Sequence, residues 1–167
     1  MGTRSQAVRG AVVVLVVLLW TGSAAAKIGA PRFGLGIILG EPTGLTGKVF
    51  LHENHALDFI AAYDITDEGF VGTIDYHFLF DPWPFRLSAA EMPLYVGIGG
   101  KVAVFGEGER KHHEHEDVGV GIRIPIGLTF LFNRVPIEVF LEIAPGIRVF
   151  PATDADVDGG VGARFYF

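Results

Sequence analysis

The last eight residues, Gly160-Val161-Gly162-Ala163-Arg164-Phe165-Tyr166-Phe167, have the alternating pattern of a β-strand and end on an aromatic residue. Successive side chains of a strand point to opposite faces, so one face carries Val161, Ala163, Phe165 and Phe167 and the other Gly160, Gly162, Arg164 and Tyr166. A soluble strand gains little from an exposed aromatic end, whereas the last strand of a closed membrane barrel needs an outward apolar and aromatic row. The stretch therefore favours the wall of a membrane β-barrel.

Eight alternating segments of this kind, separated by turn-forming residues, run from residue 32 to the end of the chain. They are 32–40, 43–51, 55–64, 70–80, 94–105, 118–132, 136–145 and 157–167. Each is long enough to span a bilayer at the usual tilt of barrel strands. An even number of strands also returns both ends of the barrel to the same side. We therefore predict an all-β fold, an eight-stranded antiparallel up-and-down transmembrane β-barrel.

The two faces of these segments differ in composition. One face is apolar, as Phe33, Leu35 and Ile37 illustrate in the first segment. The opposite face alternates glycine with charge. Its charged members, which we predict to form an interior network, are Lys48, Asp58, Asp75, Lys101, Arg123, Glu138, Glu142 and Arg164. Charges removed from water must be paired, so this face forms either an ion-pair network or the wall of a narrow pore.

Alternation alone does not say which face is inside, because a soluble barrel of the lipocalin type has the same period turned inside out. However, a solvated strand face rarely spends many positions on glycine, which weakens strands. In lipid, an outward Lys or Arg near the midplane costs about 2–4 kcal/mol. Several together exceed a typical stability of roughly 5–15 kcal/mol. We therefore predict that charge and glycine face inward, where glycine makes room for long side chains.

Two prolines, Pro125 and Pro145, fall within or at the end of predicted strands, where each removes a ladder donor. If the inward residues pair across a hairpin at 133–136, Gly127 faces Glu142 and both prolines lie at one level of the barrel. We expect a bulge or the end of regular pairing at that level.

Residues 1–26 have the layout of a secretory signal peptide, with two arginines, an apolar run of about ten residues and a small-residue end. We predict cleavage after Ala26, which leaves one domain, the barrel of residues 27–167. Removing the two signal arginines leaves 13 − 2 = 11 basic residues against 19 acidic ones, a net charge of −8. The chain has no cysteine, so disulfides cannot stabilise an exported form.

The terminal strand resembles the assembly signal of bacterial outer-membrane barrels, in which a glycine precedes two alternating aromatic residues and a carboxyl-terminal Phe. Gly162, Phe165 and Phe167 match this signal, while the polar residue usual at the position of Gly160 is missing. Four further stretches carry a wider resemblance: 40–48, 94–100, 120–128 and 136–145. They are similar to a widespread family of small outer-membrane barrels of unassigned function, related in architecture to OmpA and OmpX. The resemblance implies the fold and a location in the outer membrane of a Gram-negative bacterium, and very little chemistry.

The connections between the predicted strands differ in length and charge. With both termini in the periplasm, 106–117 is an outer loop and 81–93 a periplasmic connection. The outer loop contains His112, His113 and His115, a ligand type for divalent transition metals. Such a tract lacks fixed spacing and is more often a solvated acidic loop. These histidines are weak metal candidates, and we predict no cofactor.

An enzymatic role is the next alternative, because some eight-stranded outer-membrane barrels are lipid A acylhydrolases or acyltransferases. A hydrolase of that kind needs a serine beside a base. Ser88 is the one serine after residue 26, and it has no neighbouring histidine. Acid-base chemistry by Asp75 or His77 on the inward row is a further option. We predict that the protein is not an enzyme.

Three functions remain open from the sequence. The first is a structural or surface-interaction barrel, the second a narrow gated pore for small solutes or ions, and the third a soluble periplasmic lipocalin-like barrel that binds an apolar ligand. The expected partners are outer-membrane lipid and, during biogenesis, periplasmic chaperones and the barrel-assembly machinery. The acidic balance argues against nucleic acid, and we expect a monomer.

Overall fold

The computed structural model describes residues 33–64, 69–83, 88–105 and 118–167, so the predicted signal peptide lies outside the described residues. The described residues form ten strands, whose bounds are β1 (Phe33–Glu41), β2 (Thr43–His52), β3 (His55–Asp64), β4 (Gly69–Phe80), β5 (Ala90–Glu91), β6 (Leu94–Phe105), β7 (Val118–Arg123), β8 (Ile126–Phe132), β9 (Ile137–Phe150) and β10 (Asp154–Tyr166). No helix in these ranges is long and apolar enough to cross a membrane.

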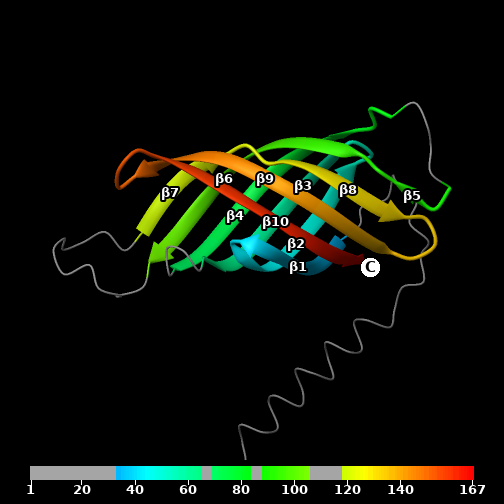
Figure 1. The fold of residues 1–167 in the computed structure, drawn as a ribbon, viewed down its shortest axis with the longest axis horizontal. Helices are drawn as coiled ribbons and strands as arrows, with labels where there is room; N and C mark the ends of the chain where they lie inside the picture. The colour runs from blue at the N-terminus through cyan, green and yellow to red at the C-terminus, as the bar shows by residue number, and fades with distance from the viewer. Residues whose placement is uncertain (1–32, 65–68, 84–87, 106–117) are drawn as a thin grey trace, which may run out of the picture.

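The strands close into a ring of antiparallel pairs (Figure 1). β1 pairs with β2 on one side and with β10 on the other, where Gly34 faces Tyr166. β7 and β8 follow one another along the same line between β6 and β9, so they are two halves of one strand of the ring. With β5 set aside, the ring has eight members in chain order. The predicted eight-stranded up-and-down architecture is confirmed.

The barrel has two ends. We call the end where β1 begins and β10 ends the terminal end, and the opposite one the loop end. The connection after β4 contains the short strand β5, which pairs with the end of β8 through Ala90 and Phe132. The indole of Trp83 donates a hydrogen bond of 2.8 Å to the carbonyl of Met92, which joins the two ends of this connection.

The predicted strand 118–132 is divided in the structure, because neither Ile124 nor Pro125 belongs to a strand. Gly127 faces Glu142, as the sequence predicted, and the register with β9 is the same on both sides of the break. The carbonyl of Pro125 still accepts a hydrogen bond of 2.7 Å from the amide of Gly97. The expected end of regular pairing is therefore confirmed at Pro125, as a gap without a change of register.

The predicted gap between the last two strands is wrong. β9 continues to Phe150 and β10 begins at Asp154, so most of 146–156 is strand. Pro145 lies inside β9, opposite Val157, and its carbonyl accepts a hydrogen bond of 2.8 Å from the amide of Ile124. A proline interrupts a strand only where a neighbouring strand needs its N–H as a donor. Here the carbonyl of Pro145 takes part in the ladder as an acceptor, so the strand continues.

Side chains alternate between the two faces of the wall, with apolar residues outside and polar residues inside. β4 shows the pattern over its whole length, since Val71, Thr73, Asp75, His77 and Leu79 are buried while the residues between them are exposed. The predicted assignment of the two faces is confirmed for this wall.

Glycines lie directly opposite large inward side chains. The pairs are Gly34 with Tyr166, Gly97 with His77, Gly99 with Asp75, Gly127 with Tyr95 and Gly162 with Phe140. A Cβ atom at any of these glycines would lie 1.8–2.7 Å from the side chain that faces it. The large side chain therefore lies flat over the backbone of the neighbouring strand. Space for aromatic rings, and not only for charged groups, accounts for the glycine-rich face.

Replacing an inward glycine is expected to destabilise the barrel. In Gly127→Ala the new Cβ atom would lie 2.3 Å from the ring of Tyr95 and 2.5 Å from the carbonyl of Leu141, which cannot retreat easily. We expect a loss of roughly 1–3 kcal/mol, the usual cost of overpacking, measured as a lower urea midpoint of the refolded protein. Gly72→Ala is the control, because nothing lies within 4 Å of its added Cβ atom. Equal midpoints for the two variants would contradict this explanation.

Candidate functional site

The interior charges are organised by the register of the strands. Across neighbouring strands, Lys48 faces Asp58, Asp58 faces Asp75, Asp75 faces Gly99 and Gly99 faces Arg123. Residues directly opposite one another on one face of a sheet are in contact range. The row therefore brings two cations and two carboxylates, distant in sequence, into the middle of the lumen.

Arg164 on β10 is the centre of one cluster. Its guanidinium lies 2.6 Å from Asp58 and 2.9 Å from Glu138, and it donates two further hydrogen bonds to the hydroxyl of Thr46. Lys48 lies 3.1 Å from the same Glu138. All these side chains are buried, so β2, β3, β9 and β10 are tied together by charge-assisted bonds inside the wall.

Glu138 and Phe140 complete this cluster. The hydroxyl of Tyr166 donates a hydrogen bond to Glu138, and the guanidinium of Arg164 lies over the ring of Phe140 at 3.8 Å from its centroid. Cation–π contact and the fork of hydrogen bonds together fix the planar group.

Arg123 on β7 is the centre of a second cluster. It contacts Asp75 at 3.3 Å, Asp158 at 2.9 Å and Glu142. Glu142 also accepts a hydrogen bond of 2.6 Å from the hydroxyl of Tyr95, which reaches across Gly127. A single guanidinium therefore compensates three carboxylates that come from three different strands.

Lys101 extends the second cluster toward the loop end. Its ammonium group lies 2.6 Å from Asp156 and 2.6 Å from Asp158, and it is only partly buried. Because Asp158 also contacts Arg123, positive and negative groups alternate from Arg123 through Asp158 and Lys101 to Asp156.

The structure brings all eight of the predicted network residues into the lumen, in the two clusters just described. Sequence reasoning missed Asp156 and Asp158, although both have the same parity as Arg164 on the last strand. It also missed Tyr95 and Tyr166 as hydrogen-bond donors to the carboxylates. Parity could have found both, because Tyr166 alternates with Arg164 and Tyr95 alternates with Gly97 and Lys101 on the inward face.

His77 lies between the two clusters and is fully buried. Its ring stacks on Tyr95 with centroids 4.4 Å apart, and its Nδ1 atom lies 3.8 Å from Asp58, too far for a hydrogen bond. Neither ring nitrogen has a hydrogen-bond partner among the described residues. The imidazole of His77 is thus enclosed within the lumen.

The lumen is closed by apolar side chains at the terminal end. Phe50, Ala56, Leu79 and Leu131 come from the terminal parts of four strands and pack with Tyr95 and Tyr166. A second apolar group, Ile38, Ile60, Ala62 and Phe140, packs on the inner side of β1 and β3. From the terminal end, the lumen is thus filled first by apolar side chains and then by the two charge clusters.

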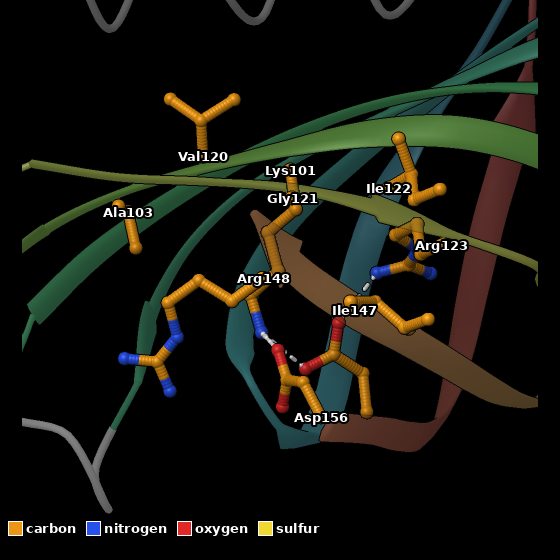
Figure 2. Close-up of a pocket in the computed structure, with 12 residues that line it drawn as sticks. Lys101, Ala103, Val120, Gly121, Ile122, Arg123, Ile147, Arg148 and Asp156 are labelled. Carbon is orange, nitrogen blue, oxygen red and sulfur yellow. Dashed lines mark hydrogen bonds and ion pairs between the residues drawn. The ribbon is translucent and has the colours of Figure 1, made fainter. Parts of the chain in front are cut away.

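A pocket opens into the lumen from the loop end (Figure 2). The cavity itself has a volume of about 20 Å³, room for little more than one water molecule, and the rest of the pocket is open to solvent. The pocket is lined by charged residues of both signs, Lys101, Arg123, Arg148, Asp156 and Asp158, while Val120 and Ile122 project away from it. Among the described residues, the pocket extends from the loop end to the second charge cluster.

The remaining predicted residues are placed as follows. His112, His113 and His115 lie outside the described residues. In the described part of the chain, no group of His, Asp or Glu side chains has the arrangement of a metal site. In the ladder between β1 and β10, Phe165 faces Leu35 and Gly162 faces Ile38. The amide of Phe167 donates a hydrogen bond of 3.0 Å to the carbonyl of Phe33. The role of Gly162, Phe165 and Phe167 as an assembly signal stays a prediction.

A closed antiparallel ring with an apolar exterior and a salt-bridged interior defines this chain as a small β-barrel protein. It belongs to the family described as protein of unknown function (DUF3996), whose sequence profile matches residues 26–165. The resemblance seen in the sequence to a barrel family of unassigned function is thereby confirmed.

The fold is similar to that in the crystal structure of the N-terminal β-barrel domain of Pseudomonas aeruginosa OprF. The two share 14% sequence identity with a TM-score of 0.62, and the match covers 83% of this chain and 99% of the OprF domain. No curated protein matches the sequence.

Removing the central cation of the second cluster is expected to destabilise the barrel more than removing a peripheral one. Arg123→Gln leaves Asp75, Glu142 and Asp158 buried without their shared partner. We expect a loss of about 3–5 kcal/mol, the usual cost of breaking a buried ion pair, measured by urea unfolding. Arg134→Gln is the control, since Arg134 is exposed in the connection between β8 and β9, where the loss of a surface charge should cost at most about 1 kcal/mol. Similar losses in both variants would show that the cluster does not act as described.

Proposed function

We propose that this protein is a monomeric barrel of the bacterial outer membrane with a structural or surface-interaction role, and that its interior is closed to steady conduction. The observation that carries the proposal is the apolar outer surface. Large apolar side chains are exposed on every long strand, including Leu45, Phe70, Ile74, Ile98, Leu141 and Val161. Water would make such a continuous apolar surface unfavourable, whereas lipid is its natural solvent.

The aromatic residues of the outer surface support the same proposal. Near the terminal end they are Phe33, Tyr76, Phe78, Phe80, Trp83, Phe132 and Phe167, and near the loop end Tyr63, Phe70 and Phe150. Rows of aromatic residues at two levels are typical of membrane barrels, where they lie at the lipid headgroups. The band between them is apolar. With the terminal end in the periplasm, the pocket faces the outside of the cell.

The filled lumen supports a closed barrel. The interior of an eight-stranded barrel is just wide enough for its own side chains. Here the apolar cluster at the terminal end and the two charge clusters above it fill the lumen, and the pocket of the loop end shares no lining residue with the apolar cluster. We propose no catalytic step and no cofactor.

A narrow gated pore is the second candidate, because the charged row and the open pocket would suit the passage of ions. The pore requires the apolar cluster around Phe50 and Leu79 to move aside. The lipocalin-like alternative requires an apolar interior. It is disfavoured, because the apolar row faces outward in all the long strands.

The location and the assembly signal are tested together by heat-modifiable migration. Outer membranes prepared from cells that produce the full chain are compared unheated and boiled. We expect the protein in this fraction with a shift on boiling, because a closed barrel resists detergent until it is heated. Deletion of Phe167 should slow or abolish appearance of the shifted form, while Val161→Ala should not. A soluble protein without a shift would overturn the proposed location.

Conduction is tested in planar bilayers. We expect no steady conductance from the wild-type protein, because the lumen is filled. Glu142→Gln keeps the shape of the network and removes one charge bound by Arg123, and it should leave a closed barrel closed. A steady current from the wild type, or one that appears in Glu142→Gln while heat-modifiable migration is unchanged, would favour the gated pore.

A further inference from the structure

The hairpin of β9 and β10 rises above its neighbour at the loop end (Figure 1). The ladder between β10 and β1 ends where Gly159 faces Glu41, and β1 then turns into β2 at Pro42. β10 continues for five more residues, Asp154–Asp158, which pair with β9 alone. In the described part of the chain no strand covers this side of the hairpin. A closed barrel has no unpaired strand edge, so the segment Asp154–Asp158 is an exception.

The backbone groups that point to the open side can be identified from the ladder. The amide of Tyr166 donates to Pro136 on the β9 side, and the amide of Phe167 donates to Phe33 on β1. Along an antiparallel strand this direction alternates, and the register of β10 with β9 is unbroken from Asp154 to Phe165. Odd-numbered residues therefore direct their N–H and C=O groups toward β1. Beyond the end of β1, these are the groups of Ala155 and Val157.

The side chains of the open segment form two distinct rows. Ala155 and Val157 lie on the outer face, and Val157 is 60% exposed. Asp154, Asp156 and Asp158 lie on the inner face, and Asp156 and Asp158 also line the pocket. The Asp154 side chain is 70% exposed and that of Asp156 is 30% exposed, although Lys101 contacts the latter. An incoming strand would meet apolar residues on one face and, on the other, the exposed carboxylate of Asp154, which lies 3.9 Å from Arg148, and the partly exposed Asp156, which Lys101 binds.

We propose that the open edge at Ala155 and Val157 binds an extended segment of a partner protein by β-strand addition. The incoming strand continues the line of β1 above the β1–β2 turn and exchanges main-chain hydrogen bonds with Ala155 and Val157. Main-chain bonds supply affinity in this mode, and alternate side chains supply specificity. Residues opposite Asp154 and Asp156 face the pocket, so basic side chains fit there. Residues opposite Val157 face outward, so apolar side chains fit there.

The aspartate row argues against a second copy of this chain as the occupant. If two open segments paired with one another with their apolar residues on the same face, aspartate would stand opposite aspartate. Like charges directly opposite one another are destabilising. The same row attracts lysine or arginine, so it discourages self-association and favours a basic partner. The inference rests on the fold and goes beyond the proposed function, since the edge is open wherever the barrel is located.

The test measures binding of a labelled peptide to the full protein in detergent micelles by fluorescence anisotropy. The probe is a short peptide of alternating lysine and valine. Two control peptides carry the same label: one has glutamate in place of lysine, and the other has N-methylated valines, which cannot donate main-chain hydrogen bonds. We expect saturable binding of the first peptide and at least about tenfold weaker binding of either control, the effect of losing one or two hydrogen bonds or the charge complement.

A variant of the edge tests the site itself. Val157→Pro removes the N–H that points to the open side and leaves the ladder with β9 in place, because that ladder uses the even-numbered residues here. Val157→Ala keeps the N–H and is the matched control. We expect Val157→Pro to weaken binding about tenfold and Val157→Ala to leave it within about twofold of wild type, with heat-modifiable migration unchanged in both. Asp154→Asn should weaken binding and reduce its dependence on salt.

Three results would overturn the inference. The first is absence of binding to the folded wild-type protein. The second is equal binding of the N-methylated peptide or of Val157→Pro, which would mean that the peptide is held by charge alone. The third is self-association of the wild type that Val157→Pro abolishes, which would make a second copy the occupant. The first two leave the proposed function untouched, because a folded barrel is established separately by its migration before and after boiling, and the third would also contradict the proposed monomeric state.

Discussion

The ring closed by β1 and β10 leaves an interior of fixed and small width, and the rest of the structure follows from that limit. A large inward side chain has room only where the neighbouring strand carries no side chain opposite it. This explains why Tyr95, Tyr166 and Phe140 each face a glycine. A charge in so narrow a space has little water, so it needs a partner from the wall. Side-chain size and charge inside the barrel are thus set by the same closure that satisfies the backbone.

Arg123 and Arg164 meet this requirement in a similar way. Each guanidinium joins carboxylates from different strands. Glu138 and Glu142 each accept a further hydrogen bond from a tyrosine hydroxyl, that of Tyr166 and that of Tyr95 respectively. Buried ion pairs are weak sources of stability, because desolvation offsets their attraction. Their stronger effect is on register. A slip of one residue would turn Arg123 or Arg164 outward onto a face otherwise made of valine, isoleucine and phenylalanine, so the network excludes alternative pairings.

The two ends of the barrel differ in what they can do. At the terminal end the lumen is packed with apolar side chains, and the connection that contains β5 lies against the wall. At the loop end the β9–β10 hairpin stands above the β1–β2 turn and exposes both a pocket and a strand edge. The pocket and the strand edge that we propose as a binding site thus lie at the loop end, while the apolar packing lies at the terminal end.

The alternation of the sequence determined the all-β class, the number of strands in the ring and the face on which each residue lies, because a period of two is a local property of the chain. It also indicated eight of the charged residues of the interior. The tertiary structure alone decided which charges meet, since pairs such as Arg164 with Asp58 depend on register across the closed ring. The same holds for the length of β9 and β10. The predicted strands ended at residue 145 and began again at 157, and only the contacts with β7 and between the two strands hold this segment extended.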